Sequence, residues 1–320
     1  MADPIELFGE RISFVLGGHR PKAIEPGRIH RFPTNDRRGD VAGWCKLFAD
    51  LRGGVFGCMR QGVSETWTAA DRRSMTVAER LALACHIEAA TREREQQQRN
   101  EWAAHARRNA DLWDQCLQLT DGDPVARYLR RRIGIEALHA PACLRFHPAL
   151  PYWHDGDKLG TYPAMVARLT ASDGRTVALH RTYLCGDGSK ADVPTVKKLT
   201  AAAGPLAGAC IRLHSPQHGM IGVAEGIETA LAASFASGVP TVAAYCAGAL
   251  AGYSWPAGVQ SLVIFADADK AGREAADRLR VRALHAGRLR VIVMTPTHDG
   301  TDWCDVWAQR GAVAVEGGAA

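Results

Sequence analysis

IGVAEGIETALAASFASGVPTVAAY, residues 221–245, opens with an apolar run that ends at Glu225 and continues into a segment of helical composition. SLVIFADADKAGREAADRL, residues 261–279, repeats this pattern and places Asp267 and Asp269 at the end of its apolar run. Strands that alternate with helices are typical of a parallel sheet, in which sites form at the carboxyl ends of the strands. The two stretches predict a Rossmann-like α/β domain with a mainly parallel central sheet.

The acidic residues of this domain suit a divalent metal ion. Residues i and i+2 of a strand share a face, so Asp267 and Asp269 should project together and repel unless a cation bridges them. Oxygen ligands favour Mg²⁺ or Mn²⁺ over zinc. A later acidic segment adds Asp302 and Asp305, which either join the metal site or cap a terminal helix. Glu228, in a first helical turn, is expected to be structural.

Composition narrows the class of protein. The chain has 320 residues, 47% of them hydrophobic, which is enough for two or three domains. No run approaches the roughly 20 apolar residues of a membrane span, and the first residues lack the order of a signal peptide. We therefore expect a cytoplasmic protein without a membrane partner. The nine cysteines form no Cys-x-x-Cys pair, so no zinc is expected.

Charge is unevenly distributed along the chain. Residues 1–217 carry 31 Lys and Arg against 24 Asp and Glu, whereas residues 218–320 carry 8 against 10. A basic region ahead of an acidic metal-binding domain suits a protein that binds polyanionic nucleic acid. The alternative is that the basic excess only aids solubility.

Turn-forming residues divide the chain into five predicted segments. The segment before residue 70 has short aromatic and β-branched runs, and the next has neither Gly nor Pro between Thr76 and Leu119, which predicts one long helix or two shorter ones. The segments are a small β-rich unit at 1–70, a helical connector at 71–120, an α+β unit at 121–216, the α/β catalytic domain at 217–312 and a flexible tail at 313–320.

Basic residues supply the candidate ligands for nucleotide or nucleic-acid phosphates, although solvated surface positions are the alternative for each. They are Arg31, Arg37, Arg38, Lys46, Arg130, Arg131, Arg181, Lys190, Lys197, Lys198 and Lys270. In the β-rich unit, Phe32, Trp44, Phe48 and Phe56 lie among such residues. These aromatics either stack on the bases of single-stranded nucleic acid or form the core of the sheet.

Together, these motifs resemble the Toprim family. Glu225, Asp267-x-Asp269 and the Gly-x-Asp-x-x-Asp segment at 300–305 follow the order seen in the Toprim domain of primases, topoisomerases and some nucleases. HRFPTNDRRGDVAGW, ARYLRRRIGI, LHRTYL, VAEGIETALA and FADADKAG look more closely like the Toprim primases that phages, plasmids and integrated elements encode. The resemblance extends from about Arg28 to Trp307.

The resemblance implies a DNA-dependent RNA primase, a nucleotidyltransferase that joins ribonucleoside triphosphates on a single-stranded DNA template during phage or plasmid replication. Glu225, Asp267 and Asp269 would be catalytic and, with Asp302 and Asp305, would hold Mg²⁺ or Mn²⁺. The first unit would correspond to the zinc ribbon of bacterial primases without its zinc ligands, and any partner helicase would be encoded separately. A Toprim nuclease and a non-catalytic DNA-binding or helicase-recruiting protein are the alternatives.

Overall fold

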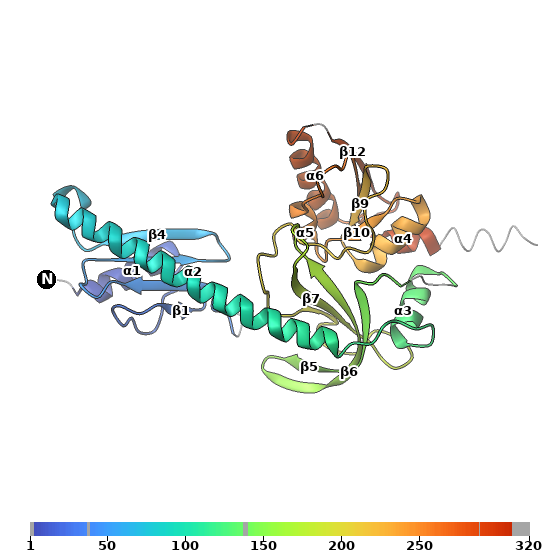
Figure 1. Ribbon diagram of the computed structural model, residues 1–320, viewed down its shortest axis with the longest axis horizontal. Coiled ribbons are helices and arrows are strands. Elements are labelled where there is room, and N and C mark those ends of the chain that lie inside the picture. The colour runs from blue at the N-terminus through green and yellow to red at the C-terminus, as the bar shows by residue number, and fades with distance from the viewer. Residues whose placement is uncertain (1–2, 37–38, 137–139, 288, 309–320) are drawn as a thin grey trace, which may run out of the picture. The chain divides into compact units, whose positions relative to one another are not determined.

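The computed structural model describes residues 3–36, 39–136, 140–287 and 289–308. Contacts divide the chain into two compact units, Met1–Glu101 and Trp102–Ala320 (Figure 1). The finer boundaries expected from the sequence stay a prediction, and the expected tail lies outside the described residues. No helix within the described residues is both long and apolar enough to cross a membrane.

The first unit is a four-stranded antiparallel sheet with a helix packed on it. Phe8 and Ile12 of that helix are fully buried, and the Phe8 ring meets Phe56 edge-on at 5.9 Å between centroids. The expected β-rich unit is confirmed, whereas its first helix was not expected. The elements, with the strands in sheet order, are α1 (Pro4–Val15), β1 (His30–Phe32), β2 (Gly43–Leu47), β3 (Gly53–Cys58), β4 (Val63–Thr68) and the 3-10 turn η1 (Arg72–Ser74).

The aromatic residues of this sheet belong to its core. Phe32, Trp44, Phe48 and Phe56 are each at most 5% exposed. Stacking on nucleic-acid bases requires an accessible ring face, so the stacking hypothesis for these four residues is wrong. Their burial supplies the core that a small sheet needs.

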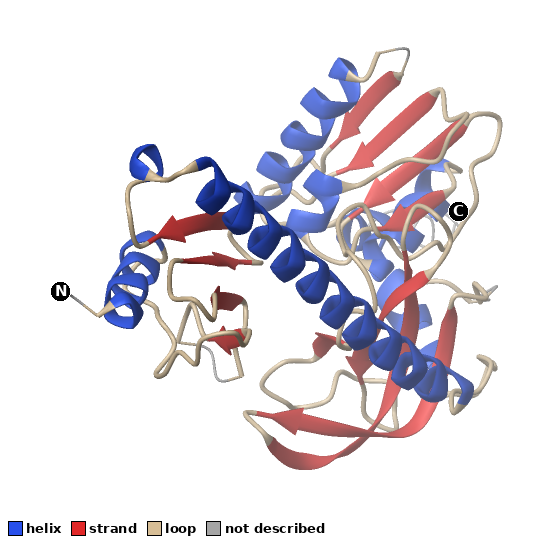
Figure 2. Cartoon of the chain, turned by 60° about the vertical axis from the view of Figure 1, so that its left-hand side comes forward, coloured by secondary structure: helices blue, strands red, loops and turns tan. Residues whose placement is uncertain are grey.

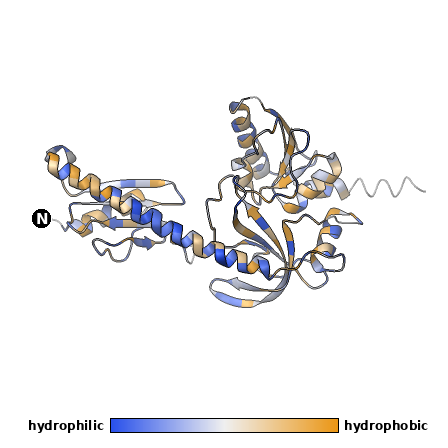
Figure 3. Cartoon of the chain, viewed as in Figure 1, coloured by the Kyte–Doolittle hydropathy of each residue, from blue (hydrophilic) through white to orange (hydrophobic). Residues whose placement is uncertain are grey.

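A single helix, α2 (Val77–Asp114), contains residues of both units. Its 38 residues correspond to a length of about 57 Å at 1.5 Å per residue. This settles the choice between one long helix and two shorter ones. The middle of α2 is mostly hydrophilic on the side that Figure 3 shows, and its side chains there pair mostly with one another.

The second unit begins with an antiparallel sheet and a short helix. Asp123 caps that helix by accepting a hydrogen bond from the amide of Ala126 at 2.8 Å, and Gly134 ends it in the left-handed conformation. In the sheet, the antiparallel strands at 157–170 and 176–183 are joined by a turn at 172–175. The elements, with the strands in sheet order, are α3 (Pro124–Ile133), β5 (Leu144–His154), β6 (Asp157–Thr170), β7 (Thr176–Tyr183) and β8 (Lys197–Leu199).

A parallel sheet follows, in the order β10-β9-β11-β12, and confirms the predicted fold class. One face packs on α4, which shares a core with α3 and the antiparallel sheet, while α5 and α6 cover the other face (Figures 1 and 2). A last helix begins at residue 303. The other elements are β9 (Met220–Ala224), α4 (Ile227–Ser237), β10 (Thr241–Ala243), α5 (Ala247–Gly252), β11 (Ser261–Phe265), α6 (Lys270–His285) and β12 (Arg290–Met294).

Candidate metal centre

The predicted carboxylates lie at the carboxyl edge of the parallel sheet. Glu225 directly follows β9, and Asp267 follows β11 by two residues. The two strands are neighbours, with Ala224 paired to Phe265, so both side chains start from the same edge. Asp269 caps α6, where its Oδ1 accepts a hydrogen bond from the amide of Gly272 at 2.7 Å.

Electrostatics show that these carboxylates lie close enough to influence one another. Burial raises the pKa of Asp267 to about 7, the charges of Glu225, Asp302 and Asp269 add to that shift, and Lys197 opposes it. Burial and then the charge of Asp269 likewise raise the pKa of Glu225. The edge of the sheet therefore concentrates negative charge that the protein neutralises only in part.

Gly272 permits the close approach of α6 to the loop that carries Asp267. A Cβ atom on Gly272 would lie 2.7 Å from the carbonyl oxygen of Asp267 and 3.1 Å from its nitrogen. The contact with the carbonyl oxygen is shorter than real Cβ atoms show, so the backbone would have to move. The glycine of the FADADKAG motif thus fixes where the helix begins relative to both aspartates.

Asp302 and Asp305 both lie at the start of the last helix. Each accepts a hydrogen bond from the amide of the other at 3.0 Å, which closes the start of the helix at 303. Arg132 of α3 pairs with Asp302 at 2.7 Å and with Asp305 at 3.6 Å. Of these two aspartates, Asp302 is the one whose charge helps to raise the pKa of Asp267. Asp302 is therefore the better candidate ligand of the two.

Lys197 is the predicted cation that reaches the carboxylate edge. Its Nζ donates to Glu228 Oε2 at 2.9 Å, and the hydroxyl of Tyr128 donates to Glu228 Oε1 at 2.5 Å. Burial alone would raise the pKa of Glu228, but the charge of Lys197 and the Tyr128 hydrogen bond lower it to about 2. Glu228 thus connects α4 to Lys197 and to Tyr128.

The edge fits a divalent ion chemically. The Oδ1 atom of Asp267 is buried and has no hydrogen-bond donor among the described residues. In the same residues, no three acidic, histidine or cysteine side chains are already arranged to hold a metal ion. Side-chain rotation of carboxylates that already repel would be needed, and a cation relieves that repulsion. The donor set is oxygen only, which suits Mg²⁺ or Mn²⁺.

The other predicted basic residues of the second unit are dispersed. Arg130 pairs with Asp121, and Arg131 donates to the carbonyl of Asp187 at 3.2 Å. Lys190 and Lys270 are exposed.

Arg181 and Lys198 are paired across β7 and β8, whereas Lys197 is paired with Thr182. Because neighbouring strand residues point to opposite faces, Arg181 and Lys198 face away from the side that Lys197 occupies.

The predicted basic residues of the first unit are partly engaged. Lys46 forms an ion pair with Glu93, and Arg31 contacts Met59 at 3.2 Å and Glu101 at 3.8 Å. Arg37 and Arg38 lie outside the described residues. Their nucleic-acid roles stay predictions.

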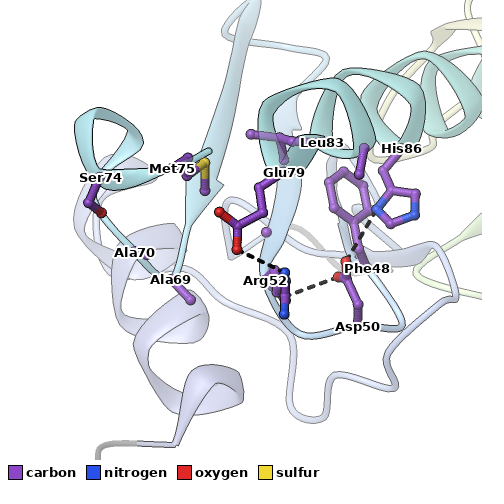
Figure 4. Close-up of a pocket in the computed structure, with 12 residues that line it drawn as sticks. Phe48, Asp50, Arg52, Ala69, Ala70, Ser74, Met75, Glu79, Leu83 and His86 are labelled. Atoms are coloured by element: carbon purple, nitrogen blue, oxygen red, sulfur yellow. Dashed lines mark hydrogen bonds and ion pairs between the residues drawn. The ribbon is translucent and has the colours of Figure 1, made fainter. Parts of the chain in front are cut away.

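A cavity of about 240 Å³ lies between α2 and the sheet of the first unit (Figure 4). Phe48 and Leu83 form part of its apolar lining. Its polar side chains already have partners, because Arg52 donates to Glu79 at 3.1 Å and His86 lies 3.5 Å from Asp50. The cavity shares no residue with the carboxylate edge.

Comparison with known proteins assigns the parallel-sheet region. Residues 220–313 match the family model described as Toprim domain. The chain contains a Toprim domain. The resemblance expected from Glu225, Asp267 and Asp269 is thus confirmed for this region. Residues 103–213, which precede the Toprim domain, match a domain of unknown function, DUF7146.

Several solved primase structures are similar to this chain at low sequence identity. A DNA primase domain from Pseudomonas aeruginosa is 17% identical over 52% of this chain and 54% of that chain, with a TM-score of 0.36. The primase fragment of the bacteriophage T7 primase-helicase protein is 16% identical over 62% and 72%, with a TM-score of 0.38. The Aquifex aeolicus primase, with its zinc-binding and RNA polymerase domains, is 14% identical over 99% and 84%, with a TM-score of 0.39.

These matches differ in extent. The chain spans about half the length of the Pseudomonas aeruginosa domain. No curated protein matches the chain.

Sequence reasoning missed two residues at this centre. Arg132 and Tyr128 both belong to α3, about 170 and 100 residues before their partners Asp302 and Glu228. The only local signal was the ARYLRRRIGI motif, in which four residues lie between Tyr128 and Ile133 on a helix with a strongly one-sided apolar face. Nothing in that pattern identifies a partner so far along the chain.

Proposed function

We propose that this protein is a DNA-dependent RNA primase that joins ribonucleotides on single-stranded DNA with Mg²⁺ or Mn²⁺. The observation that carries the proposal is Lys197, a half-exposed cation held beside the acidic edge of the Toprim domain. A nucleotidyltransferase must bind the phosphates of an incoming nucleotide next to its metal ions, and a lysine in that position suits this task.

The carboxylates have a defined part in this proposal. Glu225, Asp267, Asp269 and Asp302 would hold one or two divalent ions. When bound, such ions activate a primer 3′-hydroxyl and stabilise the pyrophosphate that leaves. Asp267 must lose its proton to serve as a ligand, and the pKa of about 7 places that loss near neutral pH.

The protein itself would orient the reactants. Glu228 and Tyr128 fix Lys197, which prevents the ammonium group from collapsing onto the catalytic carboxylates. Arg132 holds Asp302 and the start of the last helix in place. The basic balance of residues 1–217 supports binding of a polyanionic template.

Primer synthesis by the purified protein tests the proposal. Single-stranded DNA, labelled ribonucleoside triphosphates and Mg²⁺ or Mn²⁺ should give short labelled products that disappear in Asp267→Ala and Asp269→Ala. Asp299→Ala is the matched control, because Asp299 lies nearby in sequence, is 85% exposed at its side chain and pairs only with Arg273 among the described residues.

Other outcomes identify the alternatives. Degradation of DNA without added nucleotides would replace the primase with a Toprim nuclease. DNA binding with neither reaction would favour a non-catalytic protein that recruits a separately encoded helicase. A helicase that stimulates primer synthesis by the wild-type protein, but not by the Asp267→Ala and Asp269→Ala variants, would extend the proposal to that partner.

A further inference from the structure

The second unit carries a group of basic residues on the face of its antiparallel sheet that is opposite to Lys197. The strand register runs from Arg145 through Val166 and Arg181 to Lys198, so these four residues share one face. Arg168 lies two residues beyond Val166 and therefore points to the same side. Four residues of the sheet, Arg145, Arg168, Arg181 and Lys198, together with Arg108 of α2, are called the basic face here.

The carboxyl-terminal part of α2 lies against the basic face and contributes Arg108 to it (Figure 2). His105 Nδ1 lies 2.7 Å from the carbonyl oxygen of Ala202, and Asn109 donates to the carbonyl of Ala201 at 3.2 Å. Since these contacts attach α2 to the segment after β8, the helix holds Arg108 at a defined place beside the sheet.

Aromatic rings hold several of these cations. The guanidinium groups of Arg145 and Arg168 lie 4.5 and 4.1 Å from the ring centroid of Trp113. Arg145 also donates to the carbonyl of Trp113 at 3.0 Å. Lys198 lies 4.3 Å from the ring of Tyr152. A cation held in this way loses less entropy when it binds an anion.

Two clefts open along α2 on this side. The first, of about 250 Å³, is lined by His105, Arg108, Asn109 and Arg181 among others. The second, of about 120 Å³, shares Asn109 with the first and is lined by Trp113 and Arg168. Guanidinium groups therefore border both clefts.

The positive charge of the basic face is not neutralised by the protein. In the part of the chain that the structure describes, no ion pair involves Arg108, Arg145, Arg168 or Arg181, although other arginines of this unit form them. Among the described residues that line the two clefts, Asp114 is the one acidic residue. Cations left without carboxylates suit an external anion.

We propose that the basic face binds the phosphate backbone of single-stranded DNA, at a site separate from the metal centre. Strands about 4.8 Å apart spread the charges from Arg145 to Lys198 over roughly 14 Å, which suits several phosphates in a row. Trp113 and Tyr152 are buried, so bases do not stack there and binding is independent of sequence. The face extends the proposed function by holding nucleic acid away from the reacting ends.

Salt dependence of DNA binding tests this site without any need for catalysis. A fluorescent oligothymidylate is titrated with protein in EDTA over a series of KCl concentrations. The double variant Arg108→Ala/Arg168→Ala changes two exposed residues. It should lower the slope of log affinity against log salt by about 1.4, since each lost phosphate contact on a single strand accounts for about 0.7. Its affinity at low salt should fall roughly tenfold or more.

Two control variants separate the site from charge and from folding. Arg278→Ala/Arg280→Ala removes the same charge from exposed positions of α6 and should leave the slope unchanged. Arg108→Lys/Arg168→Lys keeps both charges and should keep most of the slope. An equal loss in the α6 variant, or no loss in the first variant, would overturn the proposal.

Further outcomes distinguish this inference from the proposed function. If the first variant lost affinity for ATP but not for DNA, the clefts would be a nucleotide site and the inference would be wrong. A protein that makes no primers but shows the expected change in slope would keep the basic face and remove only the proposed polymerase.

Discussion

Asp267 carries much of the unfavourable charge interaction at the candidate metal centre. Its folded-state pKa of about 7 lies above its ordinary value of 3.8. The stability that its protonated carboxyl contributes is therefore complete below pH 3.8 and is lost as the pH rises through 7. Asp267→Asn should raise the melting temperature of the metal-free protein by a few degrees at pH 8 and by much less at pH 5. Differential scanning calorimetry in EDTA measures both.

Added Mg²⁺ should make the wild-type protein more stable than Asp267→Asn. Saturating Mg²⁺ should stabilise the wild-type protein, because an ion that binds the folded state raises its free energy of unfolding. Asp267→Asn should respond much less. A variant that is less stable than the wild type at pH 8 in EDTA would contradict the proposed repulsion.

Gly272 offers a steric test of the same centre. In Gly272→Ala, the new Cβ must displace the backbone of Asp267, which should cost about 1–3 kcal/mol and weaken Mg²⁺ binding. Gly248→Ala is the matched control, because no atom beyond its chain neighbours and its own helix backbone lies within 4 Å of its new Cβ. Chemical denaturation and Mg²⁺ titration of both variants provide the measurement, and equal stability of the two would contradict the close approach.

At the scale of elements, Glu228 connects α3, β8 and α4. Lys197→Gln removes the ammonium group that pairs with the buried carboxylate of Glu228, so the free energy of unfolding should fall by about 2–4 kcal/mol at pH 7. Adding Glu228→Gln should recover part of this loss, with a coupling energy of about 1–3 kcal/mol. Additive effects in the double-mutant cycle would show that the two residues do not interact.

The pair of Lys197 and Glu228 predicts that the folded protein loses stability in acid. The folded-state pKa of Glu228 is lowered to about 2 from 4.5, so its stabilisation is present above pH 4.5 and is lost as the pH falls toward 2. Wild-type protein should lose stability over that range, and Glu228→Gln should lose less. Urea denaturation at pH 3 and pH 6 measures the difference, and identical pH dependence would contradict it.

Local patterns predicted the elements whose signals lie within a few residues, and missed those that depend on distant partners. Strand ends and caps at Glu225, Asp267 and Asp269 follow from adjacent sequence. β5 was missed because Pro148 and Pro151 argue against a strand. The structure accommodates Pro148 where the register shifts between His147 and Leu150.

For the candidate site, sequence patterns indicated the acidic residues but not the division of the basic ones. β8 has only three residues, too few for an alternating pattern to be recognised, so its two lysines were grouped with Arg181. Their separation depends on the pairing of β7 with β8. Arg132 reaches Asp302 only through tertiary packing, which local sequence does not encode.

For the whole molecule, α2 permits a test of whether the metal centre depends on an unbroken helix. Asn100→Pro should remove a helical hydrogen bond at an exposed position and destabilise the helix by about 3 kcal/mol. The centre uses only residues of the second unit, so the stabilisation by Mg²⁺ should persist. Asn100→Ala is the control, and calorimetry with and without Mg²⁺ is the measurement. Loss of the Mg²⁺ response in Asn100→Pro alone would contradict this independence.

The adjacent lysines of β8 affect how this protein tolerates an error in strand pairing. A shift of β8 by one residue reverses the face of every side chain in it. A shift that moved Lys198 into the place of Lys197 would still present an ammonium group to Glu228, while Leu199 would replace a cation on the opposite face. The repeated lysine thus protects the acidic side against one direction of misalignment, and the loss of charge would fall on the face proposed to bind DNA.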